Sequence, residues 1–225
     1  MAKTKSEVKP FAVTDCAMLS IAMGVSAQNL RELRDRLGEI PDSSIYYHFW
    51  GMRLRPRFEE PIYNNDFAHW AQESLHDRRL AERLGVIDPP SFSDMSELRA
   101  ELIDVIEERL EEMEYVPWVR PDEGFRFIRS ILVVFDTGVR ISSPEDLQPI
   151  LPTLSRSSLY YHFIDARRRS PEGLDDFQAW LSGFGERFSQ LRSEIATIDP
   201  YFTSLSNLGQ LLLACFERAG VGGAA

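Results

Sequence analysis

The sequence predicts a mostly α-helical protein made of two homologous helical repeats, each with roughly four to five helices, packed about a pseudo-two-fold axis. Two observations predict this class. A seven-residue block, Ser-Ser-(Ile/Leu)-Tyr-Tyr-His-Phe, occurs in both halves of the chain. Capping residues followed by leucines at helical spacing also recur. Since 44% of the 225 residues are hydrophobic, the chain can bury a core.

The repeated block sets the spacing of the two halves. Residues 43–49 reappear 114 residues later as residues 157–163, with only Ile replaced by Leu. The same spacing relates Phe11 to Phe125. Further blocks, Asp-Phe-x-x-Trp and Ile-Asp-Pro, recur downstream in the same order with slightly shorter spacing. A repeated order of several blocks indicates an internal duplication.

The recurring blocks divide the chain into five segments. These are an N-terminal tail over residues 1–10, repeat 1 over 11–112, a linker over 113–124, repeat 2 over 125–219 and a flexible tail over 220–225. The linker is rich in proline and charge, which is typical of a connection between folded segments.

Each repeat opens with an apolar run that ends near a glycine. In repeat 2, residues 127–135 are rich in β-branched side chains, which favour a strand. In repeat 1, residues 16–23 contain Ala, Met and Leu, which favour a helix. Because equivalent segments of a duplication share a fold, one local preference must be overridden. We predict a helix for both segments.

The next elements carry clearer helix signals. Ser143 and Pro144 mark a helix start in repeat 2, and residues 29–37 of repeat 1 place leucines on one helical face. Ser43 or Ser44 is then predicted to cap the helix that carries Tyr-Tyr-His-Phe.

Two later helices are predicted in each repeat. Asp66 and Asp176 are predicted to cap helices that carry Phe and Trp three residues apart on one face. A last helix follows each Ile-Asp-Pro block; in repeat 1 its apolar positions include Leu98 and Leu102.

The histidines of the repeated block are the leading candidate site residues. His48 and His162 could titrate near neutral pH or bind a metal, and with Asp66 and Asp176 they would form a set suited to a first-row metal. A histidine among Tyr and Phe can equally be a packing residue whose ring nitrogens bind backbone or carboxylate. Neither a His-x-x-x-His nor a Glu-x-x-His spacing surrounds either histidine, so no metal or cofactor is predicted.

The side chains around the histidines could bind an anionic ligand or an acidic partner, since arginine forks suit carboxylate and phosphate groups. The candidate ligand-binding residues are His48, His162, Tyr47, Tyr161, Arg53, Arg167, Arg55 and Arg169. The alternative is that the tyrosines pack locally and that the arginines lie at solvated helix ends.

The overall charge argues against several classes of partner. A formal net charge of −10 argues against nucleic acid and against an anionic membrane surface. The N-terminus lacks the apolar core of a signal peptide, and no apolar run is long enough to span a membrane. We therefore expect a cytoplasmic protein. Its two cysteines, Cys16 and Cys215, are expected to be buried thiols.

The assembled blocks resemble an uncharacterised prokaryotic family of domains of unknown function. In that family a Tyr-Tyr-His segment is followed by Asn-Asp-Phe-x-x-Trp. Residues 65–67 match this form, whereas residues 175–177 read Asp-Asp-Phe. The resemblance covers most of the chain and implies relatedness in fold, but it brings no activity, substrate or catalytic residue.

No catalytic motif is present: the sequence lacks a phosphate-binding glycine loop and a nucleophile elbow. We predict a non-enzymatic binding, scaffold or regulatory protein that engages a protein partner or a small anionic ligand at a cleft between the repeats. The alternative is a metal-binding protein or enzyme that uses His48 and His162. The sequence does not predict an oligomeric state.

Overall fold

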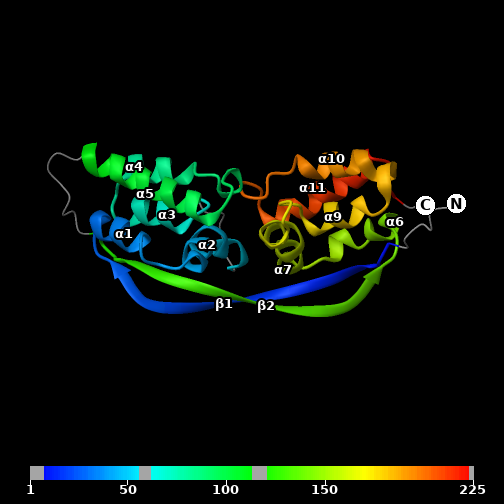
Figure 1. Ribbon diagram of the computed structural model, residues 1–225, viewed down its shortest axis with the longest axis horizontal. Helices are drawn as coiled ribbons and strands as arrows, with labels where there is room; N and C mark the ends of the chain where they lie inside the picture. Colours follow the sequence, from blue (N-terminus) through cyan, green and yellow to red (C-terminus); the bar gives the residue numbers. More distant parts are fainter. Residues whose placement is uncertain (1–7, 56–61, 113–120, 223–225) are drawn as a thin grey trace. The chain divides into compact units, whose positions relative to one another are not determined.

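The structure, a computed structural model, describes residues 8–55, 62–112 and 121–222. This part of the chain is an α+β fold, in which two long strands form an antiparallel sheet and helices lie beside them (Figure 1). The prediction of a mostly helical fold is therefore wrong, because it omitted the sheet. Parts of the predicted tails and linker, residues 1–7, 113–120 and 223–225, lie outside the described residues.

The two strands are β1 (Phe11–Ala27) and β2 (Phe125–Ile141), each 17 residues long. They cover residues 16–23 and 127–135, for which we predicted helices, so these two predictions are wrong. In β2 the local preference for a strand prevails, as its β-branched residues suggest. In β1 the helix-favouring residues 16–23 are overridden, since the backbone groups of a strand are satisfied by tertiary partners that no local propensity includes.

The chain forms two compact units that do not coincide with the two repeats. The continuous unit comprises residues 18–132, and the discontinuous unit comprises residues 1–17 together with 133–225. Each strand contributes one half to each unit. The first half of β1 therefore lies in the unit formed by the helices of repeat 2, and the first half of β2 lies in the unit formed by the helices of repeat 1.

The continuous unit contains the helices of repeat 1. They are α1 (Leu30–Leu37), α2 (Asp42–Trp50), the short 3₁₀ helix η1 (Gly51–Leu54), α3 (Asp66–Glu73), α4 (Arg78–Gly85), the 3₁₀ helix η2 (Pro89–Ser91) and α5 (Met95–Glu112). The predicted helix over residues 29–37 is confirmed as α1, which begins after the cap Asn29 and buries all three of its leucines.

The discontinuous unit contains the helices of repeat 2. They are α6 (Pro144–Leu147), η3 (Leu151–Thr153), α7 (Arg156–Leu159), the π-helix η4 (Tyr160–Asp165), α8 (Ala166–Arg169), α9 (Asp176–Ser182), η5 (Gly185–Phe188), α10 (Ser189–Ala196) and α11 (Leu205–Arg218). Ser143 caps α6 and Pro144 occupies its first turn, as predicted. Among the described helices none is long and apolar enough to cross a membrane.

The caps of the later helices differ from the prediction by one residue. Asn65 caps α3 by accepting a hydrogen bond from the N–H of Ala68, and Asp175 caps α9 in the same way. The prediction that Asp66 and Asp176 are the caps is wrong. Asp66 and Asp176 are instead the first residues of their helices, so their carboxylates are available for another role.

Two glycines interrupt the strands at equivalent positions. Gly24 in β1 has φ of +70° and Gly138 in β2 has φ of +78°, in the left-handed region that glycine enters at little cost. Both positions are exposed. The backbone conformation, rather than packing, therefore requires glycine there.

We expect Gly24→Ala to lower the free energy of unfolding by about 1–2 kcal/mol, because an L-residue in the left-handed region is strained. Nothing lies within 4 Å of the added Cβ, so no clash contributes. Gly38→Ala is the control, since Gly38 has φ of −69° and should change stability by at most about 0.5 kcal/mol. Equal losses for the two variants in urea unfolding would contradict this account.

Candidate functional site

His48 lies in α2 and is only 2% exposed. Its Nε2 accepts a hydrogen bond from the backbone N–H of Ile128 at 3.1 Å. Since Nε2 is the acceptor, the proton is on Nδ1, which donates to Oδ2 of Asp66 at 2.8 Å. Both ring nitrogens are therefore engaged within the continuous unit.

Ser44 lies one helical turn before His48, so the two side chains lie on the same face of α2. Its Oγ donates to the backbone carbonyl of Ile128 at 2.8 Å. Ser44 and His48 thus satisfy the N–H and the C=O of one strand residue, as a neighbouring strand would. We call this set, Ser44, His48 and Asp66 around Ile128, a strand clamp. The prediction that Ser43 or Ser44 caps the helix is wrong, because the cap position is Pro41.

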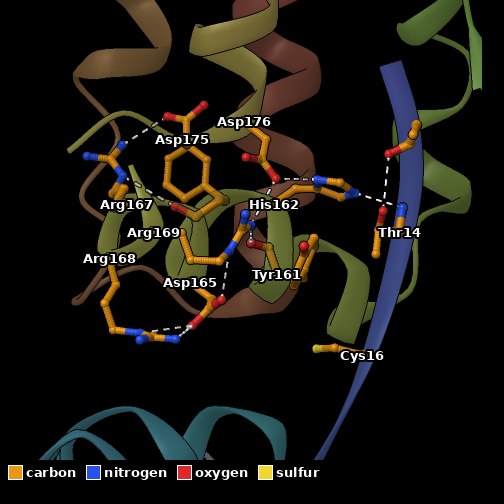
Figure 2. A network of polar contacts seen from close by, with 12 residues as sticks. Thr14, Cys16, Tyr161, His162, Asp165, Arg167, Arg168, Arg169, Asp175 and Asp176 are labelled. Atoms are coloured by element: carbon orange, nitrogen blue, oxygen red, sulfur yellow. Dashed lines mark hydrogen bonds and ion pairs between the residues drawn. The ribbon is translucent and has the colours of Figure 1, made fainter. Parts of the chain in front are cut away.

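The discontinuous unit contains an equivalent strand clamp, with Thr14 as the held residue (Figure 2). The N–H of Thr14 donates to Nε2 of His162 at 2.9 Å, and Oγ of Ser158 donates to the carbonyl of Thr14 at 2.8 Å. Nδ1 of His162 donates to Oδ2 of Asp176 at 2.7 Å. His162 is 3% exposed. The two clamps use the same groups in the same roles.

An aromatic pocket holds the strand three residues before each clamped residue. Phe125 stacks on Phe67 with ring centroids 5.0 Å apart and also contacts the His48 ring. The indole N–H of Trp70 donates to the carbonyl of Glu123 at 2.7 Å. The pocket fixes the start of the strand, and the clamp fixes its backbone further along.

The pocket of the discontinuous unit holds Phe11 in the same manner. Phe11 stacks on Phe177 at 5.3 Å and contacts the rings of His162 and Trp180. The indole of Trp180 donates to the carbonyl of Lys9 at 2.9 Å.

An arginine completes each clamp on the side of the carboxylate. Arg55 pairs with Asp66 at 3.2 Å, lies over the Tyr47 ring with its guanidinium carbon 4.8 Å from the centroid and donates to the tyrosine hydroxyl. In the other unit Arg169 pairs with Asp176 at 3.1 Å and lies 4.1 Å over the centroid of its tyrosine ring.

The predicted ligand-binding residues therefore divide into two groups. Six of them lie together at the clamps: His48, Tyr47 and Arg55 in one unit, and His162, Tyr161 and Arg169 in the other. Arg53 instead lies over the Trp50 ring. Arg167 pairs with the buried Asp175 at 3.2 Å.

The two sites differ around the tyrosine. Ser20 donates to the hydroxyl of Tyr47 at 3.0 Å, whereas Val134 occupies the equivalent position in the other half. The discontinuous unit instead buries Asp165, which pairs with Arg168 and Arg169 at 2.9 Å each. Burial raises the pKa of Tyr161.

Sequence reasoning missed the serines, Asp165 and the clamped residues Thr14 and Ile128. The serines carry a detectable signal, because the spacing Ser-x-x-x-His occurs in both copies and places the two side chains one turn apart. The clamped residues carry none, since only their backbone is bound.

The hydrogen bonds of the clamps are better suited to fixing a strand than to binding a metal ion. A metal would need the Nε2 lone pair that the strand N–H already uses. Among the described residues no group of three or more His, Cys, Asp or Glu side chains could hold a metal ion. Burial also disfavours the thiolate form of both cysteines, since it raises the pKa of Cys16 to about 12 and that of Cys215 in the same direction.

These features define a class of α+β protein in which helical units hold extended segments through a serine and a histidine. The chain belongs to DUF5752, a family of unknown function, whose model matches residues 8–217. The expected resemblance to an uncharacterised family is thereby confirmed. A search of curated proteins finds no significant match.

A solved structure has a similar fold along its whole length. OrfY from Thermoproteus tenax is 26% identical to this chain, with a TM-score of 0.79. The alignment covers 96% of this chain and 99% of OrfY. The fold with two long strands is therefore shared by a protein of the same extent.

Stability should depend on pH through His48. Burial lowers the pKa of His48 from its ordinary value of 6.5, with Asp66 opposing the shift less strongly. The unfolded chain therefore takes up the proton at a higher pH than the folded chain. The contribution of His48 to the free energy of unfolding is therefore at its maximum above pH about 6.5. Below that pH it falls by up to about 1.4 kcal/mol per pH unit.

Urea unfolding of His48→Gln across this pH range tests the assignment. The variant should lose this part of the pH dependence, and at pH about 7.5 it should be about 1–3 kcal/mol less stable, since a buried hydrogen-bonded group is altered. His69→Gln is the control, because His69 is exposed, and it should follow the parent protein. A pH dependence unchanged in His48→Gln would contradict the assignment.

Proposed function

We propose that the protein is a non-enzymatic binding protein whose partner is another protein, and that the partner binds to β2 with an extended, uncharged, apolar segment. The observation that carries this proposal is a run of large apolar side chains exposed within the discontinuous unit. They are Val133, Val134, Phe135 and Val139, with exposed fractions of 44%, 44%, 49% and 42%. Clustered apolar exposure of this kind marks interaction surfaces.

The clamps support the non-enzymatic part of the proposal. Each histidine uses Nε2 for a strand N–H and Nδ1 for a carboxylate. A general base needs a ring nitrogen within reach of a substrate proton, and neither ring presents one. The same engagement disfavours the alternative of a histidine-centred metal protein or enzyme.

The charges favour a protein partner over a small anionic ligand. The arginines beside the clamps, Arg55 and Arg169, are each paired with a carboxylate. On β2, Arg140 pairs with Asp136 on the same strand. An anion would have to displace these carboxylates, whereas an apolar segment would not.

The strand character of the run favours an extended partner segment. Valines and phenylalanine fit a pleated surface, and extended peptides commonly bind by adding to an existing sheet. Adjacent residues such as Val134 and Phe135 point to opposite faces of a strand, so both faces of β2 offer apolar contacts here.

Site-specific photo-crosslinking tests the proposal in the cells that naturally produce the protein. A photoreactive residue at Phe135 should crosslink to one identifiable protein. The same residue at Gln190, an exposed position of α10, is the control and should give no such product.

The identified protein is then purified and its affinity measured. Val134→Asp should weaken binding at least about tenfold, because it places a charge where the partner would otherwise cover an apolar side chain. Its thermal stability should stay near that of the parent protein, since Val134 is exposed. Equal crosslinking at both positions, or an unchanged affinity of Val134→Asp, would refute the proposal.

A further inference from the structure

The discontinuous unit is built from two pieces of chain separated by the whole continuous unit. The shorter piece contributes the first half of β1. We call residues 9–17 the arm. It supplies the unit with Phe11, Val13 and Cys16, all buried, and with the clamped residue Thr14.

The arm is held by contacts to residues after 132 in the chain. The Phe11 ring lies against Phe177 and Trp180, and the clamp binds the backbone of Thr14. Oγ of Ser155 also donates to the carboxylate of Asp15 at 2.8 Å. In Figure 2 the His162 ring and Thr14 of β1 approach each other directly. The unit is thus incomplete without the arm.

The clamp recognises features that any copy of the arm presents. It binds one backbone N–H and one backbone C=O, and the pocket binds a phenylalanine three residues earlier. The held residue is Thr14 in one unit and Ile128 in the other, so its side chain does not decide the fit. The arm of a second copy of this chain offers the same groups.

The residues that follow the arm continue β1 to Ala27, and many of their side chains are exposed. Ala17, Leu19 and Ser20 are exposed, and Leu19 retains 53% of its surface. This stretch contains no proline. A redirected chain would break the pairing of this stretch with β2 and the hydrogen bond from Ser20 to Tyr47, but few buried apolar contacts outside the arm itself.

We propose that two copies of the protein exchange arms, so that the clamp of Ser158 and His162 in each copy holds Thr14 of the other. The exchange is reciprocal and closes into a two-fold dimer. The docked contacts are the same as in the monomer. The equilibrium between monomer and arm-exchanged dimer therefore depends on the protein concentration relative to the effective concentration of the chain's own arm.

The sequence offers a direct probe of the exchange. Its lysines are confined to positions 3, 5 and 9, so every lysine–carboxylate crosslink starts in or just before the arm. Equal amounts of ¹⁵N-labelled and unlabelled full-length protein are unfolded together and refolded at about 1 mM, near the effective concentration of a tethered segment. The dimer is isolated, treated with a carbodiimide and analysed by mass spectrometry.

The expected result is a dimer fraction with crosslinks between a lysine peptide of one isotope and a peptide from residues 133–222 of the other. Refolding without any dimer would overturn the proposal. A mixed dimer in which such crosslinks join only peptides of the same isotope would also overturn it, because the copies would then associate through another surface.

Variants provide a second, independent measurement. Phe11→Ala should reduce the dimer yield several-fold, whereas Phe202→Ala, which alters a ring that is 47% exposed, should not. A mixture of Phe11→Ala with His162→Gln should yield more dimer than either variant alone, since one intact arm then meets one intact clamp. If the mixture shows no gain although both variants fold by circular dichroism, the proposal fails.

If either variant fails to fold, the isotope experiment on the parent protein decides the question. Val134→Asp separates this proposal from partner binding to β2, because it leaves the arm and the clamp intact. It should keep the parent's dimer yield.

Discussion

An outer strand edge presents backbone N–H and C=O groups that must find partners, and unprotected edges invite aggregation. In this protein a serine and a histidine one helical turn apart supply those partners. Each pair binds both backbone groups of one strand residue, with a carboxylate orienting the imidazole. The aromatic pocket, the paired arginine and the helix that carries the carboxylate are all arranged around this interaction. Each clamp holds a strand segment that belongs to the other repeat. The same hydrogen bonds therefore hold segments from both halves of the chain together within each compact unit.

Much of the site could be predicted from the sequence, but its purpose could not. The repeated block located His48 and its neighbours Tyr47 and Arg55, and the helix of repeat 1 that begins at Leu30 followed from its leucines. The strand β1 could not be predicted, because residues 16–23 favour a helix and only tertiary partners reverse that preference, whereas β2 follows its own local preference. The clamped residues could not be predicted either, since a backbone contact leaves no mark on the side chain.

The proposed function rests on a distinction between polar groups that are already bound within the chain and apolar side chains that remain exposed. From the sequence alone, histidine and aspartate together with arginine and tyrosine resemble the residues of an active site. In three dimensions the histidines, aspartates and arginines of the clamps are bound to other parts of the chain. The apolar side chains in the middle of β2 have no such role. The partner binding that we propose therefore depends on a surface that motif searches do not detect, and the repeated block would provide the framework that presents β2.

Each histidine accepts a hydrogen bond from a strand N–H through Nε2, and the two compact units depend on this contact. ¹⁵N NMR of the imidazoles at neutral pH measures this directly. We expect His48 and His162 both to carry the proton on Nδ1. We also expect each Nε2 to show a through-hydrogen-bond coupling, to the amide of Ile128 for His48 and to that of Thr14 for His162. Imidazoles protonated on Nε2, or doubly protonated rings without these couplings, would contradict this expectation.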